Sequence, residues 1–373
     1  MREFITGAEA IGRAALDAGC DFFAGYPITP ATPILLYMVK ELPKVGGVAF
    51  QAEDELASIG MCIGAALSGA RVLTATSGPG LSLYSENIGL AIMAEVPMVI
   101  VDCQRLGPAT GAATTTGEGD VQFLRWGTSG GYPVIVLAPA DAVDCYNLTR
   151  RAFYLSERFR LPVFVATDKE TVATLSAVEM DRYLHEPVPK RNVAPADADH
   201  VPYRIGHPAE VPVMSPFGGP HLVRVSGASY NERGSRAWRP AELDRLNRHL
   251  AAKVDQAEDE IALVRADLQP GARTVVISYG ISSGSVAEAV RLVRREGGEV
   301  SGLTVISLWP VPEQAIRDAI RDADRVVVVE MNLGQYRREI ERLATDRQQV
   351  VGVNRVDGEL ISPDQILAEG GIL

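Results

Sequence analysis

Short apolar runs alternate with longer amphipathic stretches over the first part of the chain. Apolar runs with the length of buried strands occur at residues 22–25, 72–76, 98–101, 134–137 and 163–167. Buried strands that alternate with helices are typical of a parallel sheet covered by helices. The pattern therefore predicts one α/β domain over residues 1–175.

The same alternation returns near Arg273. It predicts strands at residues 274–278, 300–305, 325–329 and 350–353, with helices at residues 285–295 and 313–321. A chain of 373 residues also exceeds the roughly 250–300 residues beyond which one hydrophobic core stops growing. We therefore expect a second α/β domain over residues 270–373.

The segment between the two predicted domains, residues 176–269, has a different character. It contains prolines at positions 187, 189, 195, 202, 208, 212, 216, 220 and 240 and little periodicity before residue 240. Apolar residues then recur at steps of three and four from Leu243 to Leu268, which predicts a single packing helix. The predicted fold class is thus α/β, with two parallel-sheet domains joined by a long irregular linker that ends in a helix.

Charge and hydropathy exclude several classes of function. Lysine and arginine total 36 against 47 aspartates and glutamates, giving a formal net charge of -11. This balance offers no general attraction to nucleic acids or anionic membranes. No apolar run reaches the roughly 18 residues of a membrane helix, and residues 1–20 lack the pattern of an export signal. A cytoplasmic location is expected, with neither nucleic acid nor membrane as a partner.

The cysteines and histidines argue against a metal centre or a Ser-His-Asp site on this chain. Cys20, Cys62, Cys103 and Cys145 are isolated from one another, without a CxxC pair. They are expected to be buried small hydrophobic residues, so that any iron-sulfur cluster lies on another chain. The histidines at positions 185, 200, 207, 221 and 249 all lie within the predicted linker and its helix, far from the serines at 77 and 82.

The strongest chemical signal lies in residues 50–80. An apolar run enters a predicted helix that opens with Glu53, Asp54 and Glu55, and the strand at residues 72–76 runs into a glycine-proline loop, TSGPG at residues 76–80. Acids at a helix start interact favourably with its positive end, and a glycine-proline loop makes a tight turn. Either feature alone has this simple structural explanation.

Together, the acids and the loop resemble the pyrimidine-binding domain of thiamine-diphosphate enzymes. In those enzymes an acid opens the helix, a glycine follows nine positions later and a TSGPG-like loop ends the next strand; Glu55 and Gly64 have this spacing. The resemblance implies that Glu55 hydrogen-bonds the aminopyrimidine ring and relays the proton that activates the cofactor. It also implies cofactor contacts from Pro27, Thr76, Ser77 and Gly78.

Two further motifs resemble those of the 2-oxoacid:ferredoxin oxidoreductases, namely GYPITP at residues 25–30 and QRLGPATG at residues 104–111. By this resemblance, Thr29 hydrogen-bonds the substrate and Arg105 holds its carboxylate, for which a planar guanidinium offers two parallel donors. The sequence departs from the family pattern at residues 114–120 and at residues 228–234, where Tyr230 replaces a common histidine.

The resemblance extends over nearly the whole chain and implies an α subunit within a complex. The second domain is similar to the carboxy-terminal domain of transketolases. The GDG segment that normally holds the diphosphate and its Mg²⁺ is missing from this sequence. A β subunit is therefore expected to carry that segment and a [4Fe-4S] cluster, with a γ subunit and a ferredoxin-like δ subunit or ferredoxin as further partners. The implied reaction converts a 2-oxoacid and coenzyme A to acyl-CoA, CO2 and reduced ferredoxin, or the reverse.

Of the substrates used within this family, we expect 2-oxoglutarate for this chain, because a separate α chain of this length with the SGPG loop is most similar to the 2-oxoglutarate subfamily. Branched-chain 2-oxoacids and pyruvate remain open. A split thiamine-dependent decarboxylase or lyase is a second possibility, and it predicts no ferredoxin partner. A third is a non-catalytic scaffolding or regulatory subunit in which Glu55 only caps a helix.

Overall fold

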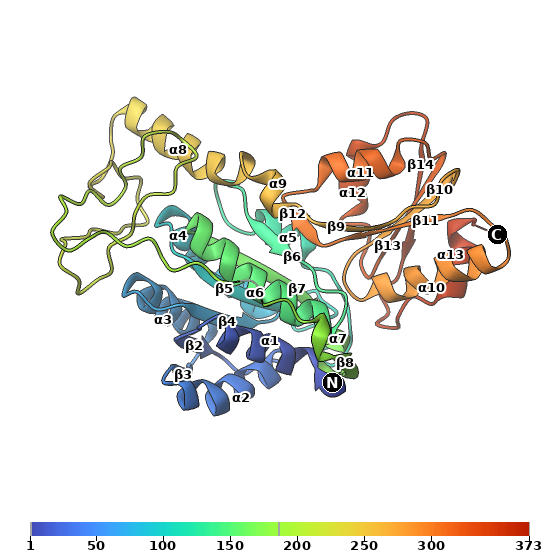
Figure 1. The fold of residues 1–373 in the computed structure, drawn as a ribbon, viewed down its shortest axis with the longest axis horizontal. Helices are drawn as coiled ribbons and strands as arrows, with labels where there is room; N and C mark the ends of the chain where they lie inside the picture. The colour runs from blue at the N-terminus through green and yellow to red at the C-terminus, as the bar shows by residue number, and fades with distance from the viewer. Residues whose placement is uncertain (1, 186, 373) are drawn as a thin grey trace.

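The computed structural model describes residues 2–185 and 187–372, which form a seven-stranded, a five-stranded and a two-stranded sheet. The seven-stranded sheet has the order β12-β6-β7-β5-β4-β2-β3 and forms the centre of the molecule (Figure 1). Its parallel strands are β2 (Phe22–Gly25), β3 (Val48–Gln51), β4 (Val72–Thr76), β5 (Met98–Gln104), β6 (Ile135–Leu137) and β7 (Pro162–Asp168). The strands that the sequence predicts in this region are confirmed within a few residues.

Alternate residues of these strands face opposite layers of helices, as the two-residue period of a strand requires. Val99 and Val101 of β5 pack with α1 (Gly7–Asp17), α2 (Thr32–Glu41) and α6 (Ala142–Phe159). Met98 and Ile100 of the same strand pack with α3 (Glu55–Leu67), α4 (Gly78–Met93) and α5 (Val121–Trp126). The shorter elements are η1 (Leu42–Val45), α7 (Lys169–Ala173), η2 (Met180–Arg182) and the antiparallel pair β1 (Arg2–Thr6) and β8 (Leu175–Glu179).

The second large sheet has the order β14-β13-β10-β11-β9. Its strands are β9 (Val264–Asp267), β10 (Thr274–Ser278), β11 (Ser301–Val305), β13 (Arg325–Glu330) and β14 (Gln349–Asn354). The helices of this unit are α10 (Ser282–Arg295), α11 (Glu313–Ile320), α12 (Arg337–Leu343) and α13 (Pro363–Gly370). The prediction of an α/β fold is confirmed here as well.

The predicted helix from Leu243 to Leu268 is correct only in its first part. Helix α8 (Pro240–Asp255) ends near Gln256 and is followed by the short α9 (Glu258–Ile261). From Val264 the chain instead forms β9, which pairs antiparallel with the free edge of β11. The apolar steps of three and four continue through this segment, but strand pairing with β11 decides its structure because it satisfies the backbone groups of that edge.

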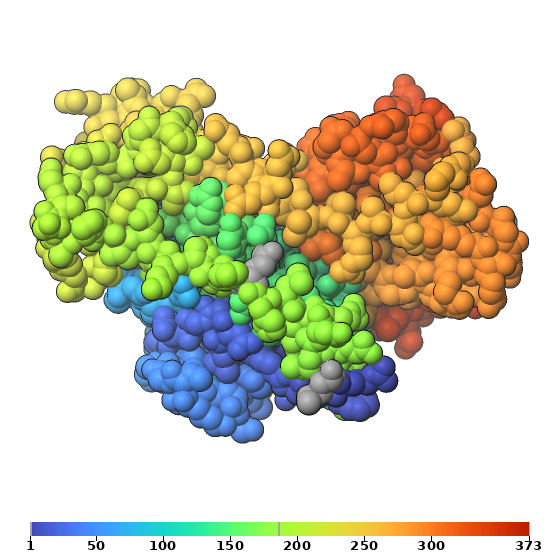
Figure 2. All heavy atoms as spheres, in the orientation of Figure 1, coloured from blue at the N-terminus to red at the C-terminus, as the bar shows by residue number. Residues whose placement is uncertain are grey.

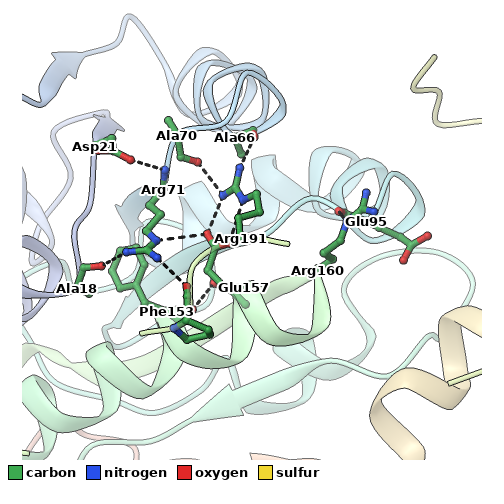
Figure 3. Close-up of polar contacts among 12 residues, drawn as sticks. Ala18, Asp21, Ala66, Ala70, Arg71, Glu95, Phe153, Glu157, Arg160 and Arg191 are labelled. Atoms are coloured by element: carbon green, nitrogen blue, oxygen red, sulfur yellow. Dashed lines mark hydrogen bonds and ion pairs between the residues drawn. The ribbon is translucent and has the colours of Figure 1, made fainter. Parts of the chain in front are cut away.

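Residues 183–239 contain only isolated bridges among the positions described, yet buried charges attach them to the first sheet. Arg191 donates to both carboxylate oxygens of Glu157 on α6, at 2.7 and 2.9 Å, and to the carbonyl oxygens of Ala66 and Ala70 (Figure 3). Arg71 donates to the carbonyl oxygen of Pro189 at 2.7 Å. The linker therefore lies as a lobe beside the first sheet, on the side opposite the second sheet (Figure 2).

The two sheets are joined by a continuous hydrophobic core and by an exchanged strand. Leu81 and Leu124 from the first unit share one core with Ile277 and Tyr336 from the second. Strand β12 (Ser307–Trp309) leaves the second unit and pairs antiparallel with β6, which makes it the last strand of the first sheet. The sequence pattern did not predict this strand.

The four cysteines are free and buried, in agreement with the expectation of small hydrophobic residues. Burial raises the pKa of the Cys62 thiol to about 12. None of the helices in residues 2–185 and 187–372 combines the length and the apolar character needed to cross a membrane.

Candidate functional site

The carboxyl ends of the central parallel strands bring the predicted motifs together, which is where open α/β sheets usually bind their ligands. Strand β4 ends at Thr76, and α4 begins two residues later at Gly78. The side-chain hydroxyls of Thr76 and Ser77 are buried and have no hydrogen-bond partner in the described part of the chain. Buried hydroxyls without partners are costly, so this loop has polar groups available for a ligand.

Glu55 lies against this loop, in the first turn of α3, and is not the residue that caps the helix. Asp54 caps α3, because its Oδ1 accepts from the backbone N–H of Ala57 at 2.7 Å. The side chain of Glu55 is buried, with 8% of the residue exposed, and packs against Gly80. A Cβ at Gly80 would lie 2.0 Å from Oγ1 of Thr76 and 2.7 Å from Cγ of Glu55, so any larger residue there would displace these side chains.

A buried hydroxyl network fixes the position of α3. The hydroxyl of Tyr84 on α4 lies 2.9 Å from Oγ of Ser58 on α3 and 2.8 Å from Oγ1 of Thr74 on β4. Burial raises the pKa of Tyr84, so the phenol stays protonated and can donate to one of these oxygens. The network holds the first turn of α3, and hence Glu55, at a fixed height above β4.

The two motifs assigned to the substrate also meet. Arg105 follows β5 and is 7% exposed, and its Nη1 donates to the backbone carbonyl oxygen of Thr29 at 2.6 Å. The Nε of Arg105 is buried without a partner among residues 2–185 and 187–372. Thr29 itself is exposed, whereas Pro27 is half-buried. One side of the guanidinium is thus anchored to the backbone, and its Nε remains available.

A cavity of about 570 Å³ opens between this edge of the sheet and the second unit. Three segments of the first unit and two loops of the second line it. Its lining includes Gly78, Pro79 and Ser82, residues 105–109, Gly117, Gly119, Asp120 and Phe123, and Met331, Asn332, Leu333, Gln335 and Val356. Gly78 and Arg105 therefore lie at one cavity wall, whereas Glu55 packs against Gly80 and does not line the cavity.

Sequence reasoning missed three acids near this cavity: Asp102 and Glu118 are buried, and Asp120 is half-buried. Glu118 joins the two units, since its Oε1 accepts from the backbone N–H of Ile281 and its backbone carbonyl accepts from Asn332 at 2.7 Å. Burial and the nearby Asp168 raise the pKa of Glu118 well above its ordinary value. The sequence of residues 114–120 could have indicated Glu118 and Asp120, because this segment departs from the family pattern and contains both acids.

One face of α3 beside Glu55 is open. Gly60 and Gly64 are exposed, and a Cβ at either position would meet none of the described atoms within 4 Å. Leu56 and Met61 on the same helix are 48% and 40% exposed. The small residues of α3 therefore allow close approach on this face, but no other segment described here occupies it.

Comparisons with known proteins agree with this arrangement. The family model for pyruvate flavodoxin/ferredoxin oxidoreductase, thiamine diP-binding, matches residues 13–246, and that for pyruvate:ferredoxin oxidoreductase core domain II matches residues 272–366. The 2-oxoglutarate synthase subunit KorA of Methanocaldococcus jannaschii is 39% identical over 371 residues, covering 98% of each chain. The ketoisovalerate oxidoreductase subunit VorB of Methanothermobacter thermautotrophicus is 35% identical, covering 98% of this chain and 96% of its own.

A solved structure is also similar over most of the molecule. The 2-oxoglutarate:ferredoxin oxidoreductase from Magnetococcus marinus, with 2-oxoglutarate, coenzyme A and succinyl-CoA bound, superimposes with a TM-score of 0.91 at 29% identity. The match covers 98% of this chain and 64% of the solved chain. This chain therefore spans about two thirds of that protein's length.

Proposed function

Since this chain belongs to the pyruvate flavodoxin/ferredoxin oxidoreductase family, we propose that it is the α subunit of a 2-oxoglutarate:ferredoxin oxidoreductase. The proposed reaction converts 2-oxoglutarate, coenzyme A and oxidised ferredoxin to succinyl-CoA, CO2 and reduced ferredoxin, or runs in reverse. Relatives named 2-oxoglutarate synthase subunit are 38–39% identical, against 34–35% for the ketoisovalerate oxidoreductase subunits. The difference favours 2-oxoglutarate over a branched-chain 2-oxoacid.

The residues present fit thiamine diphosphate. The observation that carries the assignment is Glu55: it is buried against the glycine-proline loop, although Asp54 already caps its helix. When bound, this cofactor supplies a nucleophilic carbon that adds to the carbonyl of the 2-oxoacid. In the proposal, Glu55 holds a proton toward the aminopyrimidine ring. Pro27, Thr76, Ser77 and Gly78 line the same end of the sheet and complete the pyrimidine side of the site.

Arg105 and Thr29 would bind the substrate. The unpartnered Nε of Arg105 and the second nitrogen of its guanidinium suit the two oxygens of a carboxylate. The bond from Nη1 to the carbonyl oxygen of Thr29 orients the guanidinium before substrate arrives, which lowers the entropy lost on binding. The exposed Thr29 side chain can then hydrogen-bond the substrate from the facing loop.

The proposal requires a partner, and the KorA relatives are themselves named as subunits. We propose a β subunit that holds the diphosphate, Mg²⁺ and a [4Fe-4S] cluster, with γ and ferredoxin-like δ subunits or ferredoxin as further partners. The missing GDG segment and the isolated cysteines support this division. The open face of α3, with Gly60 and Gly64 beside Glu55, is a surface on which the β subunit can approach the cofactor.

We expect the purified chain alone to contain no iron-sulfur cluster and to reduce no acceptor. Mixed anaerobically with its β subunit, thiamine diphosphate, Mg²⁺ and coenzyme A, it should reduce ferredoxin with 2-oxoglutarate. The measurements are iron content, visible absorbance and ferredoxin reduction. Stoichiometric iron in the lone chain, or reduction that does not require thiamine diphosphate, would contradict the proposal.

The same reconstituted complex tests the substrate. We expect kcat/KM for 2-oxoglutarate to exceed the values for 2-oxoisovalerate and pyruvate. A preference for 2-oxoisovalerate would instead favour a branched-chain enzyme, in line with the 35% identical VorB relative. Decarboxylation without electron transfer to ferredoxin would favour a split lyase.

Replacing Arg105 with alanine should lower kcat/KM for the 2-oxoacid, because a charge-assisted pair is lost. The corresponding loss of transition-state binding free energy is about 2–4 kcal/mol. Arg105→Lys should remain poor, since an ammonium group cannot reproduce the planar fork. Arg248→Ala removes an exposed arginine of α8 that pairs with Asp244 on the same helix, and it serves as the control. An unchanged kcat/KM in Arg105→Ala would exclude this residue from the substrate site.

A further inference from the structure

The 118–122 segment, which passes the cavity and enters α5, belongs to the first unit but is bonded by the second. The backbone N–H of Glu118 donates to the carbonyl oxygen of Met331 at 3.0 Å, next to the end of β13. The carbonyl oxygen of Glu118 accepts from Nδ2 of Asn332 at 2.7 Å, and Asn332 is only 3% exposed. The loop after β13 thus begins to hold this segment through its backbone.

Gln335, in the same loop of the second unit, bridges two further positions of the segment. Its Nε2 donates to the carbonyl oxygen of Gly119 at 2.6 Å, and its Oε1 accepts from the backbone N–H of Gln122 at 3.0 Å. In return, Nε2 of Gln122 donates to the carbonyl oxygen of Gln335 at 2.9 Å. Oδ1 of Asn332 accepts from the backbone N–H of Gln335 at 2.8 Å, which joins the two amides into one network.

The segment that this network holds also supports the backbone around Arg105. The backbone N–H of Asp120 donates to Oε1 of the buried Gln104 at 3.0 Å. Gly117 lies against the backbone on the other side, since a Cβ there would lie 3.1 Å from Cα of Leu106 and 3.4 Å from the carbonyl carbon of Arg105. A displacement of the segment would therefore shift the backbone that carries the Arg105 side chain to the cavity wall.

Arg105 depends on this support because its side chain is tied at one point. Its Nη1 donates to the carbonyl oxygen of Thr29, and its Nε has no partner in the part of the chain described. A binding group that is already fixed loses less freedom when the ligand arrives. Misplacing such a group by about 1 Å can cost on the order of 10²-fold in rate. Support through the backbone leaves the remaining donors of the guanidinium for the substrate.

We propose that Gln335 and Asn332 are positioning residues of the substrate site: through the 118–122 segment they hold Arg105 in the orientation that binds the carboxylate of the 2-oxoacid. This inference rests on the proposed function. The bonds involved run to the backbone, so neither side chain has to touch the substrate. The second unit then contributes to binding of the 2-oxoacid and not to activation of thiamine diphosphate, which is assigned to Glu55.

The test uses the complete complex with Gln335→Ala and Asn332→Ala. Each should raise KM for the 2-oxoacid and lower kcat/KM roughly 10-fold, because backbone groups of the segment lose their partners and Arg105 is no longer held in place. Hydrogen-deuterium exchange at C2 of bound thiamine diphosphate needs no substrate and should keep its wild-type rate. Gln348→Ala is the matched control, since the amide of Gln348 bonds Thr345 and Ile320 within the second unit, and it should leave both readouts unchanged.

A double-mutant cycle separates positioning of Arg105 from a direct contact between Gln335 and the substrate. The roughly 10-fold loss in Gln335→Ala should shrink to less than about 2-fold when Arg105→Ala is already present, because the group that Gln335 positions is gone. A direct contact would lower kcat/KM by the same factor in both backgrounds. Gln122→Ala removes the side-chain bond to Gln335 from the other side. It should show the same pattern with a smaller loss, and it serves as the test if Gln335→Ala does not fold.

The outcomes separate the two proposals. If wild type lacks thiamine-dependent turnover of any 2-oxoacid, the proposed function fails. If wild type turns over normally but Gln335→Ala and Gln122→Ala match Gln348→Ala, the positioning role is refuted while the proposed function stands. The same conclusion follows if the loss in Gln335→Ala is equally large beside Arg105→Ala, or if Gln335→Ala slows the exchange at C2.

Discussion

Glu55→Gln should lower kcat of the reconstituted complex by about 10²–10⁴, the usual cost of losing a positioned proton-transfer group. Glutamine keeps the shape and much of the hydrogen-bonding capacity but cannot pass the proton. Folding should barely change, because removing a charge at a helix start costs only about 0.3–1 kcal/mol. The buried contact with Gly80 is retained by an isosteric side chain, so the loss reports on chemistry rather than packing.

The neighbouring acids provide the controls for this substitution. Asp54→Asn should remain close to wild type, since asparagine also caps helices well, and Glu53 is exposed. The direct measurement is hydrogen-deuterium exchange at C2 of thiamine diphosphate bound to the α-β complex. Fast exchange in Glu55→Gln with slow exchange in Glu53→Gln would transfer the role to Glu53. If neither variant is slow, the assignment of the pyrimidine site is wrong.

The second large effect is expected at Glu95, far from the cavity. This glutamate is fully buried and adopts a positive φ of 53°. Its carboxylate accepts from Nζ of Lys253 at 2.7 Å and from the hydroxyl of Tyr230 at 3.1 Å, and lies 3.0 Å from Nε2 of His249. The cluster joins the linker and α8 to the first sheet, and Arg160 completes it by donating to the backbone carbonyl of Glu95 (Figure 3).

Glu95→Gln should lower the free energy of unfolding by about 3–5 kcal/mol, because it leaves Lys253 buried without its counter-charge. Urea denaturation measures the loss, and limited proteolysis of residues 187–239 should show the linker released. Asp244→Asn, which breaks the exposed pair with Arg248 on the same helix, should have little effect. Equal stability of Glu95→Gln and Asp244→Asn would show that this cluster does not hold the linker.

The same glutamate also makes the stability of the folded chain depend on pH. Burial alone would raise the pKa of Glu95, but Lys253, His249 and Arg160 outweigh it and hold the pKa below the ordinary value of 4.5. A carboxyl group whose pKa is lowered by folding stabilises the folded state above its unfolded pKa and loses that effect as the pH falls through its folded pKa. Wild type should therefore destabilise more steeply below pH 4.5 than Glu95→Gln.

Local patterns predicted the parts of this fold that depend on neighbours in sequence. The apolar runs identified β4 and β10 at their observed bounds because buried parallel strands read as continuous hydrophobic segments. Glu55 and the TSGPG loop were found because their spacing is local to one strand-helix-strand unit. The substrate roles predicted for Thr29 and Arg105 required a family resemblance, since the two residues belong to separate loops, and their mutual hydrogen bond was not predicted.

The remaining features depend on partners distant in sequence. The end of the predicted long helix was wrong because β9 pairs with β11, an edge that no local periodicity describes. Asp102 was hidden inside an apolar strand, and the pKa of Asp120 is raised by the burial that only folding produces. Tyr230 stood out in sequence only as a departure from the family, whereas the structure shows it bonded to the buried Glu95.

Strand β12 has a consequence for folding while the chain is being synthesised. The first sheet has all its parallel strands once β7 has been synthesised, but β6 keeps an unpaired edge until residues 307–309 emerge. An open edge is a template for pairing with other chains, and newly made domains are most exposed to aggregation at this stage. The β6 edge of the nascent amino-terminal sheet thus becomes paired only when the carboxy-terminal half of its own chain has been made.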